Sequence, residues 1–522
     1  MGQSRPEVWG GSLWRSMGQR SSMGGSMGQE KSGGRSVGQE GSGGESVGQE
    51  GSGGGSVGQE KSGGRSVGQE GSVGGSVGQG GLEDGEGSPD SPLQVQVREG
   101  RALAALGGWE LLRGLLVFAL CSNARLAQDP EAFLRWSRRL LGPPLWRGLL
   151  SVTLWGQFAV GRSPAAVRGL SEQLRARGLR PMLALPIEGE GPDGEGEAWF
   201  EHNCGAALEC VGLAAQSGPD PAMQLKVTAL LSQRLCEKLS LRLAEPEGAE
   251  LSPDKVAAML GGQVPRLTWL SPAENEHLAQ GLARLERVVQ AAAQGGVQVL
   301  VDAELTHLNP ALSCLTWGLS WRHNRDGPRA RVWGTCQAYL RDAEAHLGSA
   351  LSRAGGAGLS LGVKLVRGAY LAQEQGRARA RGRPSPTWDT PRETSDSYAR
   401  CLRLLLAAVA RPGSRVSLMV ATHNEESALQ AARGSAGTKL GLPRGGSGSV
   451  SFAQLLGMGE HLSLALAAAG LPVYKSVPLG PPEVTLPYLA RRATENRGAL
   501  AGARRERALL GAELRRRLRP WA

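Results

Sequence analysis

The stretch Val297–Leu305, V-Q-V-L-V-D-A-E-L, is a short apolar run that ends in acidic residues. It follows a longer segment, Glu274–Ala293, in which apolar residues recur at helical spacing. A short run of aliphatic and β-branched residues behind an amphipathic helix predicts a strand that is buried on both faces. Asp302 and Glu304 then stand where that strand would end.

The same alternation of a short apolar run with a longer helical stretch recurs from residue 176 to residue 500. Other amphipathic connectors are Ser395–Ala410 and Pro482–Asn496. Apolar strands joined by helical crossovers are typical of parallel sheets. Eight of them predict an α/β protein with a TIM-like (β/α)8 barrel, and an open doubly wound sheet is the alternative. The predicted strands are Pro181–Pro186, Met223–Leu230, Val297–Leu305, Arg331–Leu340, Leu359–Gly368, Val416–Asn424, Val450–Met458 and Leu471–Gly480.

The chain before the barrel has two parts of different composition. Residues 1–92 contain decapeptide repeats built on S-M-G-Q and S-V-G-Q, with Gly, Ser, Glu and Lys between them. Such a segment has little apolar surface to offset the entropy of ordering, so we expect disorder, either as a tether or without any role. Residues 93–175 have apolar residues at helical spacing and predict a helical arm. A basic helix or tail, residues 501–522, follows the barrel domain, residues 176–500.

Charge and cysteine content restrict the function classes. Residues 1–90 carry 7 basic and 11 acidic side chains, so of the net +11 of the whole chain, +15 belongs to residues 91–522. A basic body suits an anionic partner, which could be nucleic acid, an acidic membrane surface or a small carboxylate or phosphate. The seven Cys form no C-x-x-C pair, which argues against a disulfide framework or a structural zinc site. The apolar stretch Leu111–Leu120 is short and contains Arg113, which predicts a buried helix rather than a membrane span.

Polar side chains stand at the ends of the predicted strands, where barrel enzymes carry their catalytic groups. The last connector adds two adjacent arginines, Arg491 and Arg492, and with Lys226 they form a cationic set that suits a small carboxylate. The sequence has no Ser-His-Asp order, phosphate-binding loop or H-E-x-x-H motif, so hydrolytic, ATP-driven and metal chemistry are not predicted. Each single residue could also be solvated or structural. The strand-end residues are Lys226, Asp302, Glu304, Gln337, Lys364, Arg367, Thr422, His423 and Asn424.

Five segments resemble the motifs of the proline dehydrogenase family of flavoenzymes. They stand in the family's order over roughly residues 175–500, one at each strand or helix end. Within the family, the resemblance is closer to the hydroxyproline dehydrogenase branch, mitochondrial enzymes of trans-4-hydroxy-L-proline breakdown. The segments are M-Q-L-K-V-T-A-L (223–230), V-D-A-E (301–304), K-L-V-R-G-A-Y (364–370), A-T-H-N (421–424) and Y-L-A-R-R-A-T-E-N (488–496).

The resemblance implies a distorted (β/α)8 barrel that holds non-covalent FAD. The implied reaction transfers a hydride from the ring carbon beside the substrate nitrogen to the flavin, and a quinone of the inner membrane reoxidises the flavin. Arg491, Arg492 and Lys226 would bind the substrate carboxylate, and Asp302 would orient Lys226. Lys364 would lie beside flavin N5, where a cation favours the reduced flavin. The implied FAD contacts are Gln337, Arg367, Gly368, Ala369, Thr422 and His423; the implied walls of the substrate site are Tyr370, Leu456 and Tyr488; Glu495 would pair with an arginine.

Two segments depart from the family pattern. Proline-specific members have Y-K-Y-V-P-Y-G in the last strand, whereas this chain has Y-K-S-V-P-L-G, so Ser476 replaces a tyrosine. The smaller side chain opens space, and its hydroxyl can pair with a substrate hydroxyl, which predicts a preference for the hydroxylated ring. A neutral change compensated by a neighbour is the alternative. The second departure is the Gly-rich segment Gly434–Ser449, which predicts a weakened helix or a longer loop before the seventh strand.

These observations predict a mitochondrial, FAD-dependent dehydrogenase that converts trans-4-hydroxy-L-proline to 1-pyrroline-3-hydroxy-5-carboxylate. The first 20 residues have three Arg, several Ser and one Glu, which is compatible with a transit peptide, although no clear amphipathic helix accompanies them. The Arg-rich C-terminal end could lie on an anionic membrane or be a solvated helix face. The rivals are a proline dehydrogenase of relaxed specificity and a catalytically inactive scaffold or nucleic-acid-binding protein. No nucleic-acid partner is expected, because no such module is present.

Overall fold

The structure is a computed structural model, and it describes residues 91–122, 130–187, 196–245, 250–437, 450–495 and 499–518. All of them belong to one compact unit of the chain, Gly85–Ala522. The repeat segment 1–90 and most of the Gly-rich segment, residues 438–449, lie outside the described residues.

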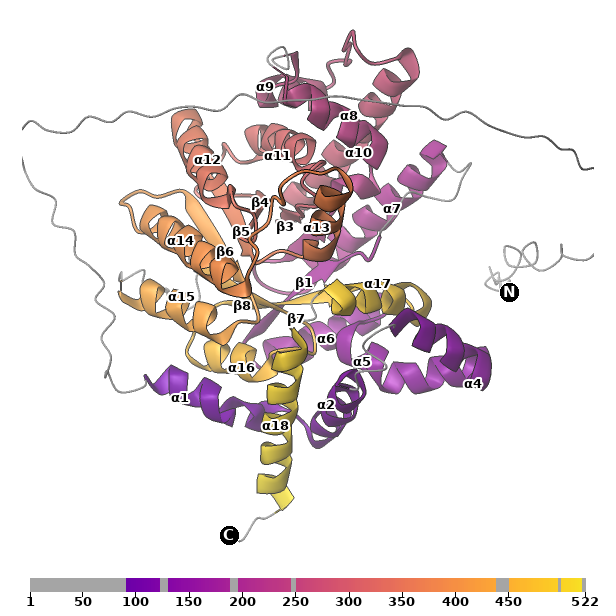
Figure 1. Ribbon diagram of the computed structural model, residues 1–522, viewed down its shortest axis with the longest axis vertical. Coiled ribbons are helices and arrows are strands. Elements are labelled where there is room, and N and C mark those ends of the chain that lie inside the picture. Colours follow the sequence, from indigo (N-terminus) through magenta and orange to yellow (C-terminus); the bar gives the residue numbers. More distant parts are fainter. Residues whose placement is uncertain are drawn as a thin grey trace, which may run out of the picture. The chain divides into compact units, whose positions relative to one another are not determined.

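Eight parallel strands form a closed barrel in sequence order, and β1 pairs with β8 to complete it (Figure 1). The predicted (β/α)8 barrel is therefore confirmed, and the open-sheet alternative is wrong. Each predicted run overlaps one strand, although β1 and β2 begin one or two residues before their runs. The strands are β1 (Leu179–Ala184), β2 (Ala222–Leu225), β3 (Gln298–Val301), β4 (Val332–Gln337), β5 (Leu361–Val366), β6 (Val416–Ala421), β7 (Val450–Leu455) and β8 (Val473–Pro478).

Helices follow the strands and surround them in Figure 1. Two long helices begin with the reciprocal cap that their sequence favours: Ser271 and Glu274 at α10, and Thr390 and Glu393 at α14, each with proline at the first helical position. The helices after β1 are α7 (Gly196–Ala215), η2 (Val227–Ala229), α8 (Gln233–Leu243), α9 (Pro253–Leu260), α10 (Pro272–Gln294), α11 (Asn309–His323), α12 (Ala343–Ala357), α13 (Leu371–Ala380), α14 (Pro391–Val409), α15 (Glu425–Gly437), α16 (Glu460–Ala468), α17 (Pro482–Glu495) and α18 (Ala499–Leu518).

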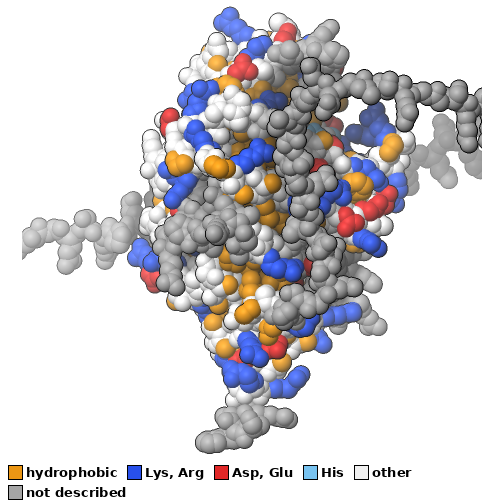
Figure 2. All heavy atoms as spheres, turned by 90° about the vertical axis from the view of Figure 1, so that its left-hand side faces the viewer, with side chains coloured by type: hydrophobic (Ala, Val, Ile, Leu, Met, Phe, Trp, Pro, Cys, Tyr) orange, Lys and Arg blue, Asp and Glu red, His pale blue; other side chains and the backbone are white. Residues whose placement is uncertain are grey.

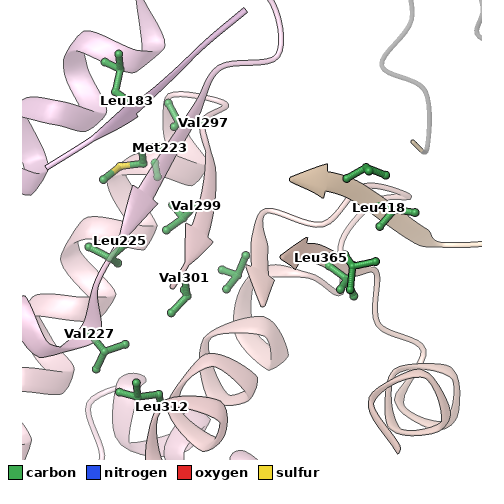
Figure 3. Close-up of a cluster of buried hydrophobic side chains, with 14 of the residues drawn as sticks. Leu183, Met223, Leu225, Val227, Val297, Val299, Val301, Leu312, Leu365 and Leu418 are labelled. Carbon is green, nitrogen blue, oxygen red and sulfur yellow. The ribbon is translucent and has the colours of Figure 1, made fainter. Parts of the chain in front are cut away.

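The strands bury both faces, as their continuous apolar composition requires. Side chains on the outer face, such as Met223, Val299 and Leu365, join the helices in the main hydrophobic core, part of which Figure 3 shows. The inner face holds a second apolar cluster, which we call the plug: Met182, Ala222, Leu300, Ala330, Trp333, Met419, Ala453 and Tyr474.

Some strands end earlier than the apolar runs suggested. The run Met223–Leu230 was predicted as strand throughout, but β2 ends at Leu225 and residues Val227–Ala229 form a 3-10 turn. Long-range bonds fix this turn, because Asn203 donates to the carbonyl of Ala229 at 3.0 Å and Thr228 donates to Glu304 at 2.7 Å. The predicted strand was too long there because apolar residues in a turn can be buried as well as those in a strand.

A set of helices precedes the barrel, in the range predicted as a helical arm. The C-terminal helix α18 packs against α2 (Figure 1), where Leu510 is buried and the backbone of Gly114 lies close to it. Arg517 of α18 donates to the carbonyls of Ala104 and Leu106 at 3.1 and 2.9 Å. The helices are α1 (Pro92–Glu99), η1 (Arg101–Ala105), α2 (Gly108–Cys121), α4 (Pro130–Val152), α5 (Leu154–Phe158) and α6 (Pro164–Arg175).

Helix α18 also caps a barrel helix. The buried carboxylate of Glu506 accepts the backbone N–H groups of Gly459 and Glu460, both at 2.8 Å. These are the first N–H groups of α16, which have no partner within their own helix. A segment beyond the barrel therefore completes the start of one of its helices.

Helix α4 has a kink at Gly142, which has a φ of +70° and is followed by Pro143 and Pro144. One face of α4 packs on α17 through Trp146 and Leu150, which contact Leu486. Of the helices that the structure describes, none is both long and apolar enough to cross a membrane. The stretch Leu111–Leu120 lies in α2, and only one of its faces is buried, since Leu112 and Leu116 are exposed.

Candidate active site

Polar side chains replace the apolar plug toward the carboxyl ends of the strands. In a strand, residues two apart point to the same side. Gln224, Lys364 and Ser476 each follow by two positions an inner residue of the plug or a glycine packed against it. Asp302 has the same relation to Leu300 and directly follows β3. The barrel interior therefore has a polar layer above the apolar one, on the same strands.

An ion pair stands in this polar layer. The ammonium of Lys364 on β5 donates to Asp302 Oδ1 at 2.5 Å, and the lysine residue is only 4 % exposed. The backbone N–H of Asp302 donates to the carbonyl of Leu225, which holds the aspartate beside β2. A buried cation with a single carboxylate partner is suited to interact with negative charge that develops in the barrel mouth. Both residues were predicted as catalytic.

Lys226 and Glu304 are a second cation and carboxylate that lie near each other and interact electrostatically. Lys226 directly follows β2, and Glu304 accepts from the hydroxyl of Thr228 at 2.7 Å. Burial raises the pKa of the Glu304 carboxyl, although the charge of Lys226 and the hydrogen bond from Thr228 act in the opposite direction. The carboxyl is thus held in a place where its ionised form is costly unless a cation stays near.

Gln337, at the end of β4, is part of a buried amide network. Its side-chain nitrogen donates to the carbonyl of Glu304 at 3.1 Å, and its oxygen accepts from Asn309 at 2.9 Å. Asn309 in turn accepts the N–H of Glu304 at 2.9 Å. The network fixes the loop that carries Asp302 and Glu304. Sequence reasoning missed Asn309, although its place five residues after Glu304 and before a proline suggested a loop-fixing role.

Arg367 and Gly368 follow β5 and form a place for an anionic group. Arg367 donates to Ser395 at 2.7 Å, but its Nη1 is buried without a hydrogen-bond partner. Burial lowers the pKa of Arg367, because the charged guanidinium has lost contact with water. An anion bound there would stabilise the charged form by ion pairing. Gly368 has a φ of +131°, and a Cβ atom on it would lie 2.3 Å from the ring of Tyr339. Only glycine fits this turn, and Ala369 follows it half-buried.

Thr422 and His423 follow β6 and are held by the neighbouring strand. The N–H of Leu455 donates to His423 Nε2 at 3.3 Å, and Gln454 donates to the carbonyl of Thr422 at 3.1 Å. Burial, with a smaller effect from Lys475, lowers the pKa of His423 to about 3. The imidazole is therefore neutral at physiological pH and can offer a hydrogen bond but no charge.

Ser476 on β8 lies in the polar layer and is 6 % exposed. Its hydroxyl donates to Gln224 Oε1 on β2 at 3.0 Å, across the neighbouring β1. Because the hydrogen of Ser476 is engaged, its oxygen lone pairs remain as acceptors. Gln224 was missed from the sequence, although it stands two residues before Lys226 and so shares its face of the strand.

The other predicted residues divide between described and undescribed side chains. Tyr370 and Leu456 are buried, at the start of α13 and just after β7, and Tyr488 is half-buried on α17. The backbone of Arg491, Arg492 and Glu495 is helical and belongs to α17, but their side chains lie outside the described part of the structure. The structure thus brings Lys226, Asp302, Lys364 and Ser476 to one end of the barrel.

Comparison with known proteins gives a consistent match. The proline dehydrogenase family model matches residues 171–505. Hydroxyproline dehydrogenase of Homo sapiens is 47 % identical over 446 residues, which cover 83 % of this chain and 96 % of the relative. Hydroxyproline dehydrogenase of Xenopus laevis is 43 % identical over 422 residues, which cover 80 % of this chain and 90 % of the relative. Proline dehydrogenase 1, mitochondrial, of Homo sapiens is 28 % identical over 79 % of this chain and 87 % of its own.

Among solved structures, the fold is similar to that of proline utilization A from Bradyrhizobium japonicum, with a TM-score of 0.52 and 20 % identity. That match covers 81 % of this chain but 45 % of the bacterial chain, so this protein spans less than half of the solved structure. Proline utilization A from Bdellovibrio bacteriovorus matches with a TM-score of 0.51, over 78 % of this chain and 37 % of its own. The sequence comparisons agree, both with the family model and with individual relatives, and the barrel and its strand-end residues fit them. This chain belongs to the proline dehydrogenase family.

Proposed function

We propose that the protein is an FAD-dependent dehydrogenase that oxidises trans-4-hydroxy-L-proline to 1-pyrroline-3-hydroxy-5-carboxylate and passes the two electrons to a quinone. Membership of the proline dehydrogenase family supports an oxidoreductase acting on a proline-type ring. Identity of 47 % over nearly the full length of a hydroxyproline dehydrogenase, against 28 % for a proline dehydrogenase, supports the hydroxylated ring as substrate.

One observation carries the choice of substrate, namely the hydrogen bond from Ser476 to Gln224. It orients the serine oxygen as an acceptor in a buried layer, where a 4-hydroxyl group of the substrate would donate to it. Proline has no hydroxyl and would leave this oxygen unpaired at a cost. The Ser476–Gln224 pair therefore favours the hydroxylated ring over proline.

Cations would hold the substrate carboxylate. Lys226 stands at the end of β2, and we assign it this role together with Arg491 and Arg492 of α17. Glu304, kept in place by Thr228 and the Gln337–Asn309 network, would steady Lys226 when no substrate is present. Tyr370, Leu456 and Tyr488 would wall the ring and exclude water. The proposed set fixes the ring so that the carbon beside its nitrogen faces the barrel mouth.

The residues after β5 fit a dinucleotide cofactor. The unpartnered Nη1 of Arg367 suits an oxygen of a pyrophosphate, and Gly368 leaves room where any side chain would collide with Tyr339. We assign further contacts to Gln337, Ala369, Thr422 and His423. The chemistry that bound FAD supplies is acceptance of a hydride from the substrate ring. Lys364, held by Asp302, would stabilise the negative charge that this transfer places near the mouth of the barrel.

We place the enzyme in mitochondria, on the matrix side of the inner membrane, because proline dehydrogenase relatives are named mitochondrial and a membrane quinone is the proposed acceptor. The C-terminal helix gives little support to a membrane role of its own. Its Arg516 and Arg517 pair with Glu513 at 2.8 and 2.7 Å, and its Arg505 pairs with Glu425 at 2.6 Å. These arginines are engaged by the protein itself.

Visible absorbance of the purified protein tests the proposal. We expect a flavin spectrum that bleaches under anaerobic conditions when trans-4-hydroxy-L-proline is added, and more slowly with L-proline. Equal bleaching by both would keep the dehydrogenase and reject the role of Ser476, in favour of a relaxed proline dehydrogenase. A protein that stays colourless after FAD is supplied would reject the flavoenzyme and favour an inactive scaffold.

A further inference from the structure

The kinked helix α4 exposes large apolar side chains to solvent. Trp136 and Leu140 are 60 % and 66 % exposed, and Leu145, Leu149 and Val152 are each more than half exposed. Their spacing of three or four residues puts them on one side of each half of the helix. Trp146 and Leu150, about 100° round the helix from Leu145 and Leu149, pack on α17. Exposed large apolar side chains gathered in this number on one helix mark an interaction surface rather than an ordinary solvated helix.

Arginines are frequent in α4. The sequence of α4 contains Arg135, Arg138, Arg139 and Arg147 against a single acidic residue, Glu131. Arg138 lies over the ring of Trp146 at 5.8 Å, and Arg147 pairs with Glu483 at the start of α17. All four arginines are exposed, but Arg138 and Arg147 contact the side of α4 that packs on α17, so Arg135 and Arg139 supply the positive charge beside the exposed apolar residues.

Two other parts of the surface can be compared with α4. Basic and hydrophobic side chains are scattered over the face drawn in Figure 2, on the side of the molecule away from α4. Helix α2 exposes Trp109, Leu112 and Leu116, but its one arginine, Arg113, donates to Gln157 at 2.9 Å and is half-buried. On α4, five exposed large apolar side chains and exposed arginines occur on one helix.

We propose that the outer face of α4 docks on an anionic lipid bilayer. Trp and Leu enter the interface between headgroups and acyl chains, and flanking arginines bind anionic headgroups, as in amphipathic helices that lie on a membrane. A second copy of the chain fits less well, because a symmetric contact would bring the same arginines face to face. The decapeptide repeats, residues 16–80, have about one Val or Met in ten residues, too few to cover the patch.

Docking through α4 would place α17, the helix that we assign to substrate binding, close to the membrane. Helix α17 packs directly on the inner side of α4 and carries Tyr488, Arg491 and Arg492. A quinone that stays in the bilayer would then meet the protein beside the barrel mouth. This consequence rests on the proposed function, whereas binding of lipid by α4 does not.

Vesicle flotation of the full chain tests the surface. Wild-type protein should float with vesicles of phosphatidylcholine mixed with phosphatidylglycerol and should stay behind with phosphatidylcholine alone. The double variant Leu140→Ser/Leu149→Ser should partition about tenfold more weakly, because two apolar groups no longer enter the interface. Arg139→Gln should weaken binding only to the anionic vesicles. Leu241→Ser, at a leucine of α8 that is 65 % exposed, is the matched control and should float as wild type does.

Three results would overturn the docking surface: equal flotation of the double variant and wild type, an equal loss in Leu241→Ser, or a wild-type dimer in solution that the double variant converts to monomer. The last result would assign the face to a second copy. Oxidation of hydroxyproline with a water-soluble acceptor should be the same in the double variant and wild type. A failure of that activity in both would count against the proposed function and leave the lipid result intact.

Discussion

The barrel interior has two layers that share the same strands and differ in almost every physical respect. The plug consists of Met182, Leu300, Trp333, Met419 and Tyr474 with small residues between them, and it is closed to solvent. The polar layer, Gln224, Asp302, Lys364 and Ser476, begins two residues further along four strands. A shift of two residues along a strand thus separates side chains that pack the barrel interior from side chains that can contact a ligand at its mouth.

The difference between the layers teaches where substitutions should affect folding and where they should affect catalysis. In the plug, neighbours fit by shape: the ring of Trp333 lies 2.3 Å from the position that a Cβ on Gly362 would occupy, so glycine is required there. In the polar layer, neighbours are matched by charge and hydrogen bonding, as in Lys364 with Asp302. Plug variants should therefore change the free energy of unfolding, and polar-layer variants should change rates.

The largest effect is expected from Trp333→Ala in the plug. Removal of this buried ring should lower the free energy of unfolding by about 3–5 kcal/mol, since it leaves a cavity that the rigid barrel cannot fill. Urea denaturation measures the change, and Trp333→Phe, which keeps most of the volume, should lose less. A loss below about 1 kcal/mol would contradict the rigid plug.

The second effect concerns the ion pair of the polar layer. Lys364→Met should lower kcat/KM for hydroxyproline by about 10²–10³-fold, because a positioned cation is lost where negative charge develops. The double variant Lys364→Met/Asp302→Asn should recover stability, since no carboxylate is left unpaired, but not activity. Rapid-reaction measurement of flavin bleaching, with urea midpoints beside it, separates the two. Recovery of the rate in the double variant would reduce the pair to a structural role.

The third effect is on substrate preference. Ser476→Ala should lower kcat/KM for hydroxyproline about threefold to tenfold, the equivalent of one hydrogen bond of about 0.5–1.5 kcal/mol, and should leave proline oxidation unchanged. Ser451→Ala is the matched control, because Ser451 is a buried serine of β7 that donates only to the carbonyl of Leu418. The measurement is the ratio of kcat/KM for the two imino acids. An unchanged ratio in Ser476→Ala would remove the basis for the proposed specificity.

The smallest effect concerns the pH dependence of stability. Burial raises the pKa of Glu304, so its contribution to stability is present at acid pH and is lost as the pH rises through the raised pKa. Glu304→Gln should lack this loss and should gain stability relative to wild type from acid to neutral pH. Urea midpoints across this range measure the slope.

Glu286→Gln gives the opposite slope as a control. Burial would raise the pKa of Glu286, but hydrogen bonds from His323 and Arg322 outweigh it and lower the pKa. The stability that Glu286 contributes is therefore present above the ordinary carboxyl pKa and is lost as the pH falls. Parallel slopes in the Glu304 and Glu286 variants would mean that the two carboxyls do not differ as described.

Much of the barrel was predictable from the sequence because its strands are buried on both faces. A continuous apolar run such as Pro181–Pro186 favours a buried strand when helices flank it. The polar residues at strand ends were predictable for the same reason, since an apolar run that stops at Lys226 or Asp302 needs a cause. What these residues contact depends on which strands meet across the barrel, and the sequence does not contain that information.

The pairs across the barrel show the limit most clearly. The resemblance implies that Asp302 orients Lys226 and neighbouring groups, and the structure adds a hydrogen bond from Lys364 to Asp302, across β4, that the sequence did not predict. Gln224 was overlooked because an isolated glutamine in a short strand has no motif, and its partner Ser476 lies 252 residues away. Closure of the barrel brings both pairs together, and only the closed geometry makes them visible.

The carboxylate that Glu506 contributes to α16 has a consequence for how the gene tolerates damage. A premature stop codon between the codons for Glu495 and Glu506 would leave every residue of the barrel and of its polar layer encoded. The product would still lack the cap on α16 and the helix that covers α2. Such an allele would produce a chain with a complete active-site sequence that the cell's quality control degrades, so its defect would be in the amount of enzyme and not in its chemistry.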